Sequence, residues 1–242
     1  MKISIIIPMH NEEGNAAIIL DSLMDGVKKW SDEYEILAVD DNSTDGTPRI
    51  LKDYSLRYNS IAVVTKRDNK GGMGEALMEG MRWSSGEAIV WLMGDLSDDV
   101  GKIPEIIEKI REGYDIVFAS RYMRGASSGD LGKLKAFLSS RFTVLAALLF
   151  GIKTHDITNA FRGFRKELVD TIKLESSDFA ISPELAIKAH LLGYKSGEIA
   201  CSYKSRIAGE TNFKMFRMVL KYLTLSKYRF YKRKDLTKWE KS

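Results

Sequence analysis

The stretch ISIIIPMHNEE, residues 3–13, joins a short apolar run to a polar cluster, and this change from apolar to polar recurs through the first 120 residues. The apolar runs are four or five residues long, which suits parallel strands that are covered on both faces. Stretches of helical period separate the runs. We expect strands at Ile3–Ile7, Glu35–Val39, Ile61–Val64, Ala88–Leu92 and Ile116–Ala119.

The intervening helices are predicted from apolar stripes and start signals. Residues 16–30 carry apolar side chains at helical spacing, and Pro48 is tolerated in the first turn of a helix that Ser43 or Thr44 can cap. Repeated strand–helix units predict an α/β fold, with a Rossmann-like, mostly parallel sheet flanked by helices. Ligands of such sheets bind at the carboxyl ends of the strands.

The second half of the chain is less regular. We expect helices over about 131–150, 183–192 and 213–231, and a strand over 195–203. No internal repeat or low-complexity linker interrupts the sequence, so we expect a single domain over residues 1–242.

Cysteine content and hydropathy indicate a cytoplasmic protein. Cys201 is the only cysteine, which excludes an intramolecular disulfide framework and suits a reducing compartment. The N-terminal residues lack the features of a signal peptide, and no run reaches the roughly 18 apolar residues of a transmembrane helix.

Positive charge is concentrated at the C-terminal end. Residues 201–242 contain 12 Lys and Arg against three Asp and Glu, a net charge of +9, whereas the rest of the chain carries −5. This asymmetry indicates a negatively charged partner. The acidic remainder and the lack of a recognition motif argue against nucleic acid.

The helix expected over 213–231 combines aromatic and aliphatic side chains with Lys and Arg, the profile of an amphipathic helix in a lipid interface. Packing on the domain with a solvated basic face explains the pattern equally well. The segment 136–152 has the same ambiguity, and together the two helices would form a groove for a lipid tail.

Three polar clusters follow predicted strands: PMHNEE at 8–13, DDNSTDGT at 40–47 and GDLSDD at 94–99. Such residues form turns, which is the alternative interpretation for any one cluster. Carboxylates and amides at strand ends also bind a nucleotide and hold a divalent cation beside a diphosphate. We favour the ligand-binding interpretation because all three clusters lie at strand ends.

Several strings together resemble a known family. The strings IIIPMHNEE, VDDNSTDGT, GGMGEALMEGM and ASRYMRG are similar to those of the family-2 inverting glycosyltransferases with a GT-A fold. DITNAFRGFRKEL and SRIAGETNFKMFRMVLKYL resemble the polyprenol-phosphate branch, which includes dolichol-phosphate mannose synthase. The resemblance covers about residues 2–231 and implies a nucleotide-sugar half at 1–120, an acceptor half at 121–210 and a basic amphipathic C-terminal helix at 211–242.

The resemblance assigns roles to individual positions. It implies nucleotide-sugar binding by Pro8, Asn11, Glu12, Asp41 and Asp95, with Lys70 near the donor. It implies acceptor-phosphate binding by Arg121, Lys135, Ser139 and Arg206. Asp95, Arg121 and Arg206 are the expected catalytic residues.

The metal-binding motif departs from the family pattern. The family motif is D-x-D, but Met93 replaces its first acid, leaving Asp95. A thioether is a poor ligand for Mg²⁺, which prefers oxygen. We therefore expect Mg²⁺ or Mn²⁺ to be held by Asp95 and Ser97, with Asp98 or Asp99 as further candidates and the donor diphosphate completing the site.

The resemblance implies transfer of a hexose, with inversion, from GDP-mannose or a UDP-hexose to a polyprenyl phosphate at the cytoplasmic face of the membrane. A phosphate acceptor is already anionic and needs no general base. Two alternatives stay open: a saccharide hydroxyl acceptor, or a catalytically silent nucleotide-sugar-binding module. Glu184 is a candidate base for a hydroxyl acceptor, or an acid favoured in the first turn of a helix.

Overall fold

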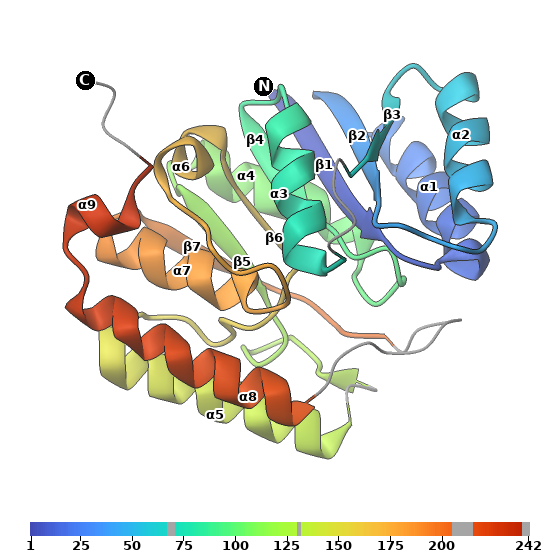
Figure 1. Cartoon of the computed structure of the whole chain (residues 1–242). Coiled ribbons are helices and arrows are strands. Elements are labelled where there is room, and N and C mark those ends of the chain that lie inside the picture. The colour runs from blue at the N-terminus through green and yellow to red at the C-terminus, as the bar shows by residue number, and fades with distance from the viewer. Residues whose placement is uncertain (67–70, 130–131, 205–214, 239–242) are drawn as a thin grey trace.

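The computed structural model describes residues 1–66, 71–129, 132–204 and 215–238. Within them a seven-stranded sheet has the order β3-β2-β1-β4-β6-β5-β7 (Figure 1). The strands are β1 (Lys2–Met9), β2 (Glu33–Asp40), β3 (Ile61–Thr65), β4 (Ala88–Trp91), β5 (Ile116–Ser120), β6 (Arg162–Arg165) and β7 (Ser196–Ala200).

The parallel part of the sheet contains the strands predicted from the apolar runs. β1 pairs in parallel with both β2 and β4, and β5 pairs in parallel with β7. The predicted strand over 195–203 is confirmed as the shorter β7. β6 was not predicted: it reads RGFR and runs antiparallel between β4 and β5. Because it has no apolar run, its sequence gives no strand signal.

Helices cover both faces of the sheet. The helices are α1 (Glu13–Val27), α2 (Thr47–Arg57), α3 (Met73–Trp83), α4 (Ile103–Arg111), α5 (Lys133–Phe150), α6 (Lys166–Thr171), α7 (Ile181–Leu191), α8 (Met215–Thr224) and α9 (Arg233–Leu236), with 3-10 helices η1 (Val100–Lys102) and η3 (Leu225–Phe230). The predicted helix over 213–231 is thus an α-helix, α8, followed by η3. The short elements α6, α9 and η1 were not predicted.

Alternate side chains of each central strand enter two separate cores. Ile5 and Ile7 pack with α1, α2 and α4 on one face, while Ile6 packs with α3, α6 and α7 on the other. All three isoleucines are fully buried, and each contributes about 1.5–3 kcal/mol of transfer free energy. This two-sided burial explains why the strands are continuous apolar runs rather than alternating ones.

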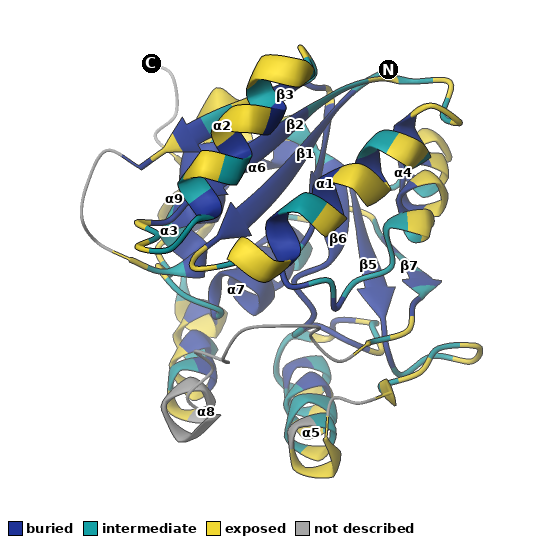
Figure 2. Cartoon of the chain, turned by 90° about the vertical axis from the view of Figure 1, so that its right-hand side faces the viewer, coloured by how far each residue is buried: buried dark blue, intermediate teal, exposed yellow. Residues whose placement is uncertain are grey.

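Helices α5 and α8 run beside each other below the sheet in Figure 1. Figure 2 shows both of them extending away from the sheet, with exposed residues on each. Gly151, in the left-handed conformation at φ 77°, ends α5, and Nε2 of His190 on α7 hydrogen-bonds to the carbonyl of Phe150 at 2.9 Å. Among the described residues, no helix is long and apolar enough to cross a membrane.

Candidate active site

Backbone strain marks the carboxyl end of the sheet. Asn11, Asn42 and Leu96 have φ values of 55°, 57° and 62°, and they follow β1, β2 and β4 respectively. Asparagine tolerates this region, but leucine seldom adopts it, so Leu96 is held there by its surroundings. Such strain concentrates at ligand-binding sites. Each of the three polar clusters identified in the sequence therefore contains one residue with a strained backbone conformation.

The loops after β1 and β2 are joined by side-chain to backbone hydrogen bonds. Asn11 N donates to Oγ of Ser43 at 3.0 Å, and its Oδ1 accepts from Thr44 N at 2.8 Å. Glu12 N donates to Oγ1 of Thr47 at 2.8 Å. The predicted residues Asn11 and Glu12 are thereby fixed beside the Asp41 loop.

Asp41 lies at the centre of this region with both carboxylate oxygens engaged. Oδ1 accepts from Nζ of Lys66 at 2.7 Å, and Oδ2 accepts from Gly72 N at 2.7 Å. The Lys66 and Asp41 side chains are only 3% and 7% exposed, so solvent screens this ion pair little. Oδ1 also accepts from Nδ2 of Asn42 at 3.4 Å, so the second lone pair of Oδ2 is the acceptor capacity that is left for a ligand. Lys66 was not singled out from the sequence, although it directly follows β3.

Pro8 occupies a buried position in β1 rather than a loop. Its carbonyl oxygen lies 3.1 Å from the position that a Cβ on Gly94 would occupy, so the backbone of the acidic loop after β4 packs closely against β1. The structure thus places the first and third polar clusters in contact. It brings the predicted nucleotide residues Pro8, Asn11, Glu12 and Asp41 to one end of the sheet, next to Asp95.

The acidic loop after β4 folds back on itself. Asp95, only 4% exposed, accepts from Ser97 N at 3.1 Å through Oδ1. Asp98 accepts from Met93 N at 3.1 Å through Oδ2, so its carboxylate lies at the backbone of the residue that replaces the missing acid. Burial and the charge of Asp95 raise the pKa of Asp98 to about 7, against the hydrogen bond from Met93 N and the charge of Arg121.

These donors suit a divalent cation that is shared with a diphosphate. Asp95, Ser97 and Asp98 supply hard oxygen ligands from one short loop. Mg²⁺ is commonly held by one or two carboxylates together with substrate phosphates. The described residues contain no group of three His, Cys, Asp or Glu side chains arranged as a metal site. Asp95, Ser97 and Asp98 could therefore hold a cation together with the phosphates of a bound nucleotide.

Arg121 is held in a buried ion pair. Its Nε donates to Oδ2 of Asp156 at 2.7 Å, and its Nη2 donates to Oδ1 at 3.1 Å and to Thr158 Oγ1 at 2.9 Å. Asp156 is fully buried, and although burial raises its pKa, the charge and hydrogen bonds of Arg121 outweigh this effect and lower it. Asp156 opens the string DITNAFRGFRKEL, but its role as the partner of Arg121 was not predicted.

Tyr122 connects Arg121 to the predicted acceptor residue Ser139. The Arg121 guanidinium carbon lies 5.5 Å from the centre of the Tyr122 ring, and the Tyr122 hydroxyl hydrogen-bonds to Ser139 Oγ on α5. One helical turn further, Oγ1 of Thr143 accepts from Ile157 N at 3.2 Å. The inner face of α5 is therefore polar near Arg121.

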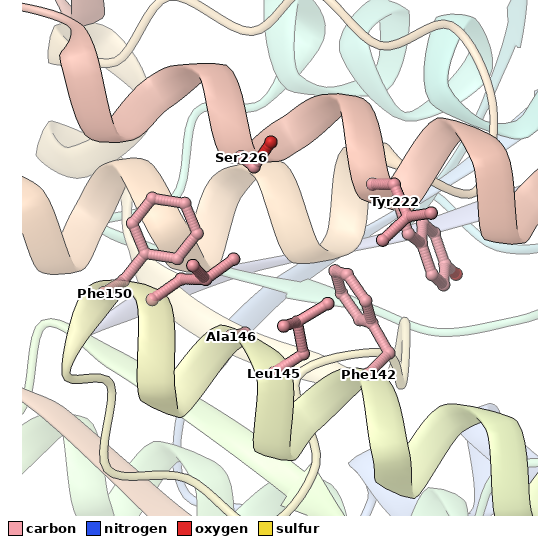
Figure 3. Close-up of a pocket in the computed structure, with 8 residues that line it drawn as sticks. Phe142, Leu145, Ala146, Phe150, Tyr222 and Ser226 are labelled. Atoms are coloured by element: carbon pink, nitrogen blue, oxygen red, sulfur yellow. The ribbon is translucent and has the colours of Figure 1, made fainter.

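The same face of α5 becomes apolar toward its C-terminal end, where it borders a cavity of about 300 Å³ (Figure 3). The rings of Phe142 and Tyr222, which both line this cavity, are in contact with their centres 4.6 Å apart. Burial raises the pKa of Tyr222, and the charge of Asp156 acts in the same direction against the charges of Arg121 and Arg162. The cavity is lined by Phe142, Leu145, Ala146, Leu149, Phe150, Tyr222, Leu223 and Ser226.

The carboxylate of Glu184 is fully buried and is hydrogen-bonded to several neighbouring groups. Its carboxylate accepts from Glu175 N at 2.9 Å, from Ser176 N at 2.8 Å and from Nζ of the fully buried Lys188 at 2.6 Å. The Tyr228 hydroxyl lies 3.0 Å from its Oε1. Of the two interpretations of Glu184, the geometry favours a structural acid over a general base.

Three predicted residues lie outside what can be described. Lys70 and Arg206 fall in segments outside the described residues, and Lys135 lies on α5 but its side chain is outside the described part. Their assignments remain predictions, as does the three-part division of the chain.

Comparison with protein families identifies a match that covers most of the chain. Residues 4–173 match the family described as Glycosyl transferase family 2. The chain is 30% identical over 220 residues to a dolichol-phosphate mannosyltransferase of Pyrococcus furiosus, covering 88% of this chain and 60% of that protein. It is 32% identical over 173 residues to an uncharacterised glycosyltransferase of Synechocystis, covering 72% and 53%. The chain thus spans less than two thirds of the curated relatives it matches.

Solved structures resemble the fold. Glucosyl-3-phosphoglycerate synthase from Mycobacterium tuberculosis in complex with UDP has a TM-score of 0.72 at 17% identity, covering 94% of this chain and 79% of that one. The same enzyme with Mg²⁺ and UDP has a TM-score of 0.72 at 16% identity, covering 94% and 79%. With Mn²⁺, UDP and phosphoglyceric acid it has a TM-score of 0.72 at 18% identity, covering 94% and 78%. These likenesses confirm the expected α/β, GT-A-type fold.

Proposed function

Because the chain belongs to glycosyl transferase family 2, we propose that it transfers a hexose from a nucleotide-diphosphate sugar to a polyprenyl phosphate with inversion. The expectation of a family-2 glycosyltransferase is confirmed by the family match and by the 30% identity to the Pyrococcus enzyme. The donor, the metal, the lipid acceptor and the membrane location are the proposal, and each is supported by separate features of the site.

The donor binds at the carboxyl ends of β1, β2 and β4. Asp41, ordered by Lys66 and Gly72 N, accepts hydrogen bonds from the nucleoside, with Asn11 and Glu12 beside it. GDP-mannose and UDP-hexoses both carry an N–H group on the base that a carboxylate can accept. Asp95 lies next to this site and faces the sugar diphosphate.

Asp95 and Asp98 hold the divalent cation, Mg²⁺ or Mn²⁺, with Ser97 as a further oxygen donor. The Asp98 carboxylate lies at Met93 N and so replaces the acid that is missing from position 93. The cation, when bound, neutralises negative charge that develops on the leaving diphosphate. This support is independent of the acceptor, and Mg²⁺ and Mn²⁺ accompany UDP in the structurally similar synthase.

The observation that carries the lipid-phosphate proposal is the change along the inner face of α5. Tyr122 and Ser139 make a polar end beside Arg121, and the apolar cavity begins one turn further at Phe142. A polyprenyl phosphate has the same order, with an anionic head followed by an apolar chain. The cavity volume of about 300 Å³ lies at the lower limit of ligand pockets, which suits part of a long chain whose remainder stays in lipid.

The reaction is a single displacement. A phosphate oxygen of the acceptor attacks the anomeric carbon, and the bond from that carbon to the donor diphosphate breaks, so the nucleoside diphosphate leaves with the electron pair. No proton has to be removed, because the acceptor is already anionic. Arg121 stabilises the acceptor phosphate through its Nη1, since Nε and Nη2 are bound to Asp156 and Thr158. Lys135 and Arg206 remain proposed partners of the same phosphate.

The apolar surface supports peripheral attachment to a membrane, at its cytoplasmic face. Among the residues whose side chains the structure describes, seven of the eleven exposed large hydrophobic ones lie on α5, α8 and η3. Basic residues lie among them, including Arg141, Lys227 and Arg229, and each adds about 1 kcal/mol of attraction to an anionic surface. The seven are Leu134, Phe137, Val144, Leu148, Leu220, Leu223 and Phe230.

A saccharide hydroxyl acceptor is less well supported. It requires a general base within hydrogen-bond distance of the hydroxyl. Glu184 is the candidate that the sequence offers, but it is fully buried and hydrogen-bonded to Lys188 and to two backbone amides.

The test is transfer of radiolabelled sugar from a panel of GDP- and UDP-sugars into organic-extractable polyprenyl phosphate, with Mg²⁺, Mn²⁺ or chelator. We expect labelled lipid from one donor, lost with chelator and in Asp95→Asn, with an inverted anomeric configuration. Labelling of a free saccharide instead of lipid would contradict the acceptor assignment. Nucleotide binding without transfer to any acceptor would indicate the catalytically silent module.

A further inference from the structure

Residues 173–178 lie in the connection between α6 and α7 and contact two different parts of the protein. On one side they contact the glycine turn at the start of α3, which binds Asp41. On the other side they contact the C-terminal elements α8, η3 and α9. We call residues 173–178 the bridging segment.

The bridging segment fixes the glycine turn by close backbone contact. Ser177 O accepts from Glu75 N at 3.2 Å. A Cβ on Gly72 or on Gly74 would lie 2.4 Å from a carbonyl oxygen, that of Ser177 and of Ser176 respectively, so only glycine fits at either position. Gly72, at φ 144°, then directs its N–H to Oδ2 of Asp41. The orientation of this donor therefore depends on where the bridging segment lies.

The C-terminal elements hold the opposite side of the bridging segment. The Tyr228 hydroxyl on η3, which is 1% exposed, lies 3.0 Å from Oε2 of Glu175. Lys221 on α8 forms an ion pair with Asp178. Lys173 N donates to the carbonyl of Leu236 on α9 at 2.9 Å.

Buried charge makes this attachment rigid. Glu184 on α7 binds the bridging segment through the backbone amides of Glu175 and Ser176, and the same Oε1 lies within 3.0 Å of the Tyr228 hydroxyl. Removing one partner from a buried, hydrogen-bonded network leaves the others unsatisfied, so such a network keeps one geometry. The described residues thus form a continuous path of contacts from η3 through Glu184 and the bridging segment to Asp41.

We propose that the C-terminal elements position the nucleotide site through the bridging segment, with Tyr228 and Lys221 as positioning residues for the nucleoside diphosphate. Neither residue touches the donor in this proposal. It rests on the proposed function in one respect, the assignment of Asp41 to the nucleoside. Affinity for the nucleotide then depends on side chains that belong to the acceptor side of the molecule.

The test measures the binding of GDP and UDP, with Mg²⁺, by isothermal titration calorimetry on the full chain without lipid. We expect Tyr228→Phe and Lys221→Met each to raise the dissociation constant about fivefold or more, in the range usual for coupled sites. In transfer assays the donor KM should rise while kcat changes little. Lys221→Arg, which keeps the charge, should restore the affinity.

Two matched controls separate positioning from general loosening. Tyr231→Phe removes a neighbouring hydroxyl that makes no hydrogen bond among the described residues, and Arg229→Met removes a side chain that binds the carbonyl of Leu149 on α5 instead of the bridging segment. Both should bind nucleotide as the wild type does. Circular dichroism and the unfolding midpoint establish that each variant is folded.

Unchanged affinity in folded Tyr228→Phe and Lys221→Met would overturn the proposal, and so would an equal loss in the two controls. Wild-type affinity for GDP or UDP tests the donor assignment separately. Because no lipid enters the titration, a wrong acceptor assignment leaves the result unaffected.

Discussion

Replacing Asp156 with asparagine should destabilise the protein strongly, although the two side chains have nearly the same shape. Asp156 Oδ2 accepts from Nε of Arg121, and Oδ1 accepts from Nη2 and from Thr158. An amide keeps one acceptor oxygen but points an NH₂ group at a guanidinium donor. It also leaves Arg121, which is 9% exposed, without its counter-charge.

The magnitude follows from the burial of both partners. Removing one partner of a buried ion pair costs about 3–5 kcal/mol. For a chain of this length each kcal/mol lowers the melting temperature by about 2–4 °C, so we expect a decrease of about 6–20 °C. Asp53→Asn, at an exposed acid on α2, is the matched control and should change stability by less than about 0.5 kcal/mol.

The assay is urea unfolding followed by circular dichroism at a series of pH values. Because Arg121 lowers the pKa of Asp156 in the folded protein, the pair stabilises fully above about pH 4, the ordinary aspartate value. That stabilisation is lost as the pH falls through the lowered folded-state pKa. The free energy of unfolding of Asp156→Asn should therefore decrease less than that of the wild type as the pH is lowered into the acid range.

A double-mutant cycle with Arg121→Gln tests whether the two residues act as a pair. The double variant should be less destabilised than the sum of the single variants, by up to about 3 kcal/mol. A loss below about 1 kcal/mol in Asp156→Asn at neutral pH, or additive effects in the cycle, would show that Arg121 and Asp156 do not act as a buried ion pair. Arg121 would then be free to bind substrate with its whole guanidinium.

Three further predictions concern the metal, the cavity and Glu184. Asp98→Asn should weaken Mn²⁺ binding in the presence of UDP at least about tenfold, as measured by electron paramagnetic resonance. Adding Met93→Asp to that variant should restore Mn²⁺ binding, whereas unchanged Mn²⁺ affinity in Asp98→Asn would contradict the assignment of Asp98 as a ligand. Ser226→Phe should fill the cavity and raise the KM for long-chain polyprenyl phosphate about threefold or more, while the KM for the donor stays constant. An equal rise in the KM for short-chain acceptors would exclude the cavity as the binding site of the lipid tail. Glu184→Gln should lower stability by about 3 kcal/mol, because it removes the nearer of the two carboxylates that pair with buried Lys188, but should leave the shape of the pH–rate profile unchanged; loss of the acidic limb from that profile would restore Glu184 as a general base.

The sequence alone was sufficient to predict every strand except β6, most helices and the placement of three polar clusters. These features are local, because periodicity and strand-end polarity are written in consecutive residues. The parallel strands were recognisable since both of their faces are buried, which makes them continuous apolar runs such as Ile3–Ile7. The order of the motifs then gave the family, which the comparisons confirmed.

Which charged groups form pairs depends on the tertiary structure and cannot be predicted from local sequence. Asp156 lies 35 residues from Arg121, and Lys66 lies 25 residues from Asp41, yet each pair is buried and hydrogen-bonded. Nothing in the local sequence distinguishes these residues from solvated ones, because their pairing depends on how the segments after β2, β3 and β5 and the segment before β6 are packed together. The same reason explains why β6 was missed and why Glu184 was an open choice. A buried carboxylate is defined by the partners that surround it, and chain folding brings those partners together from distant segments.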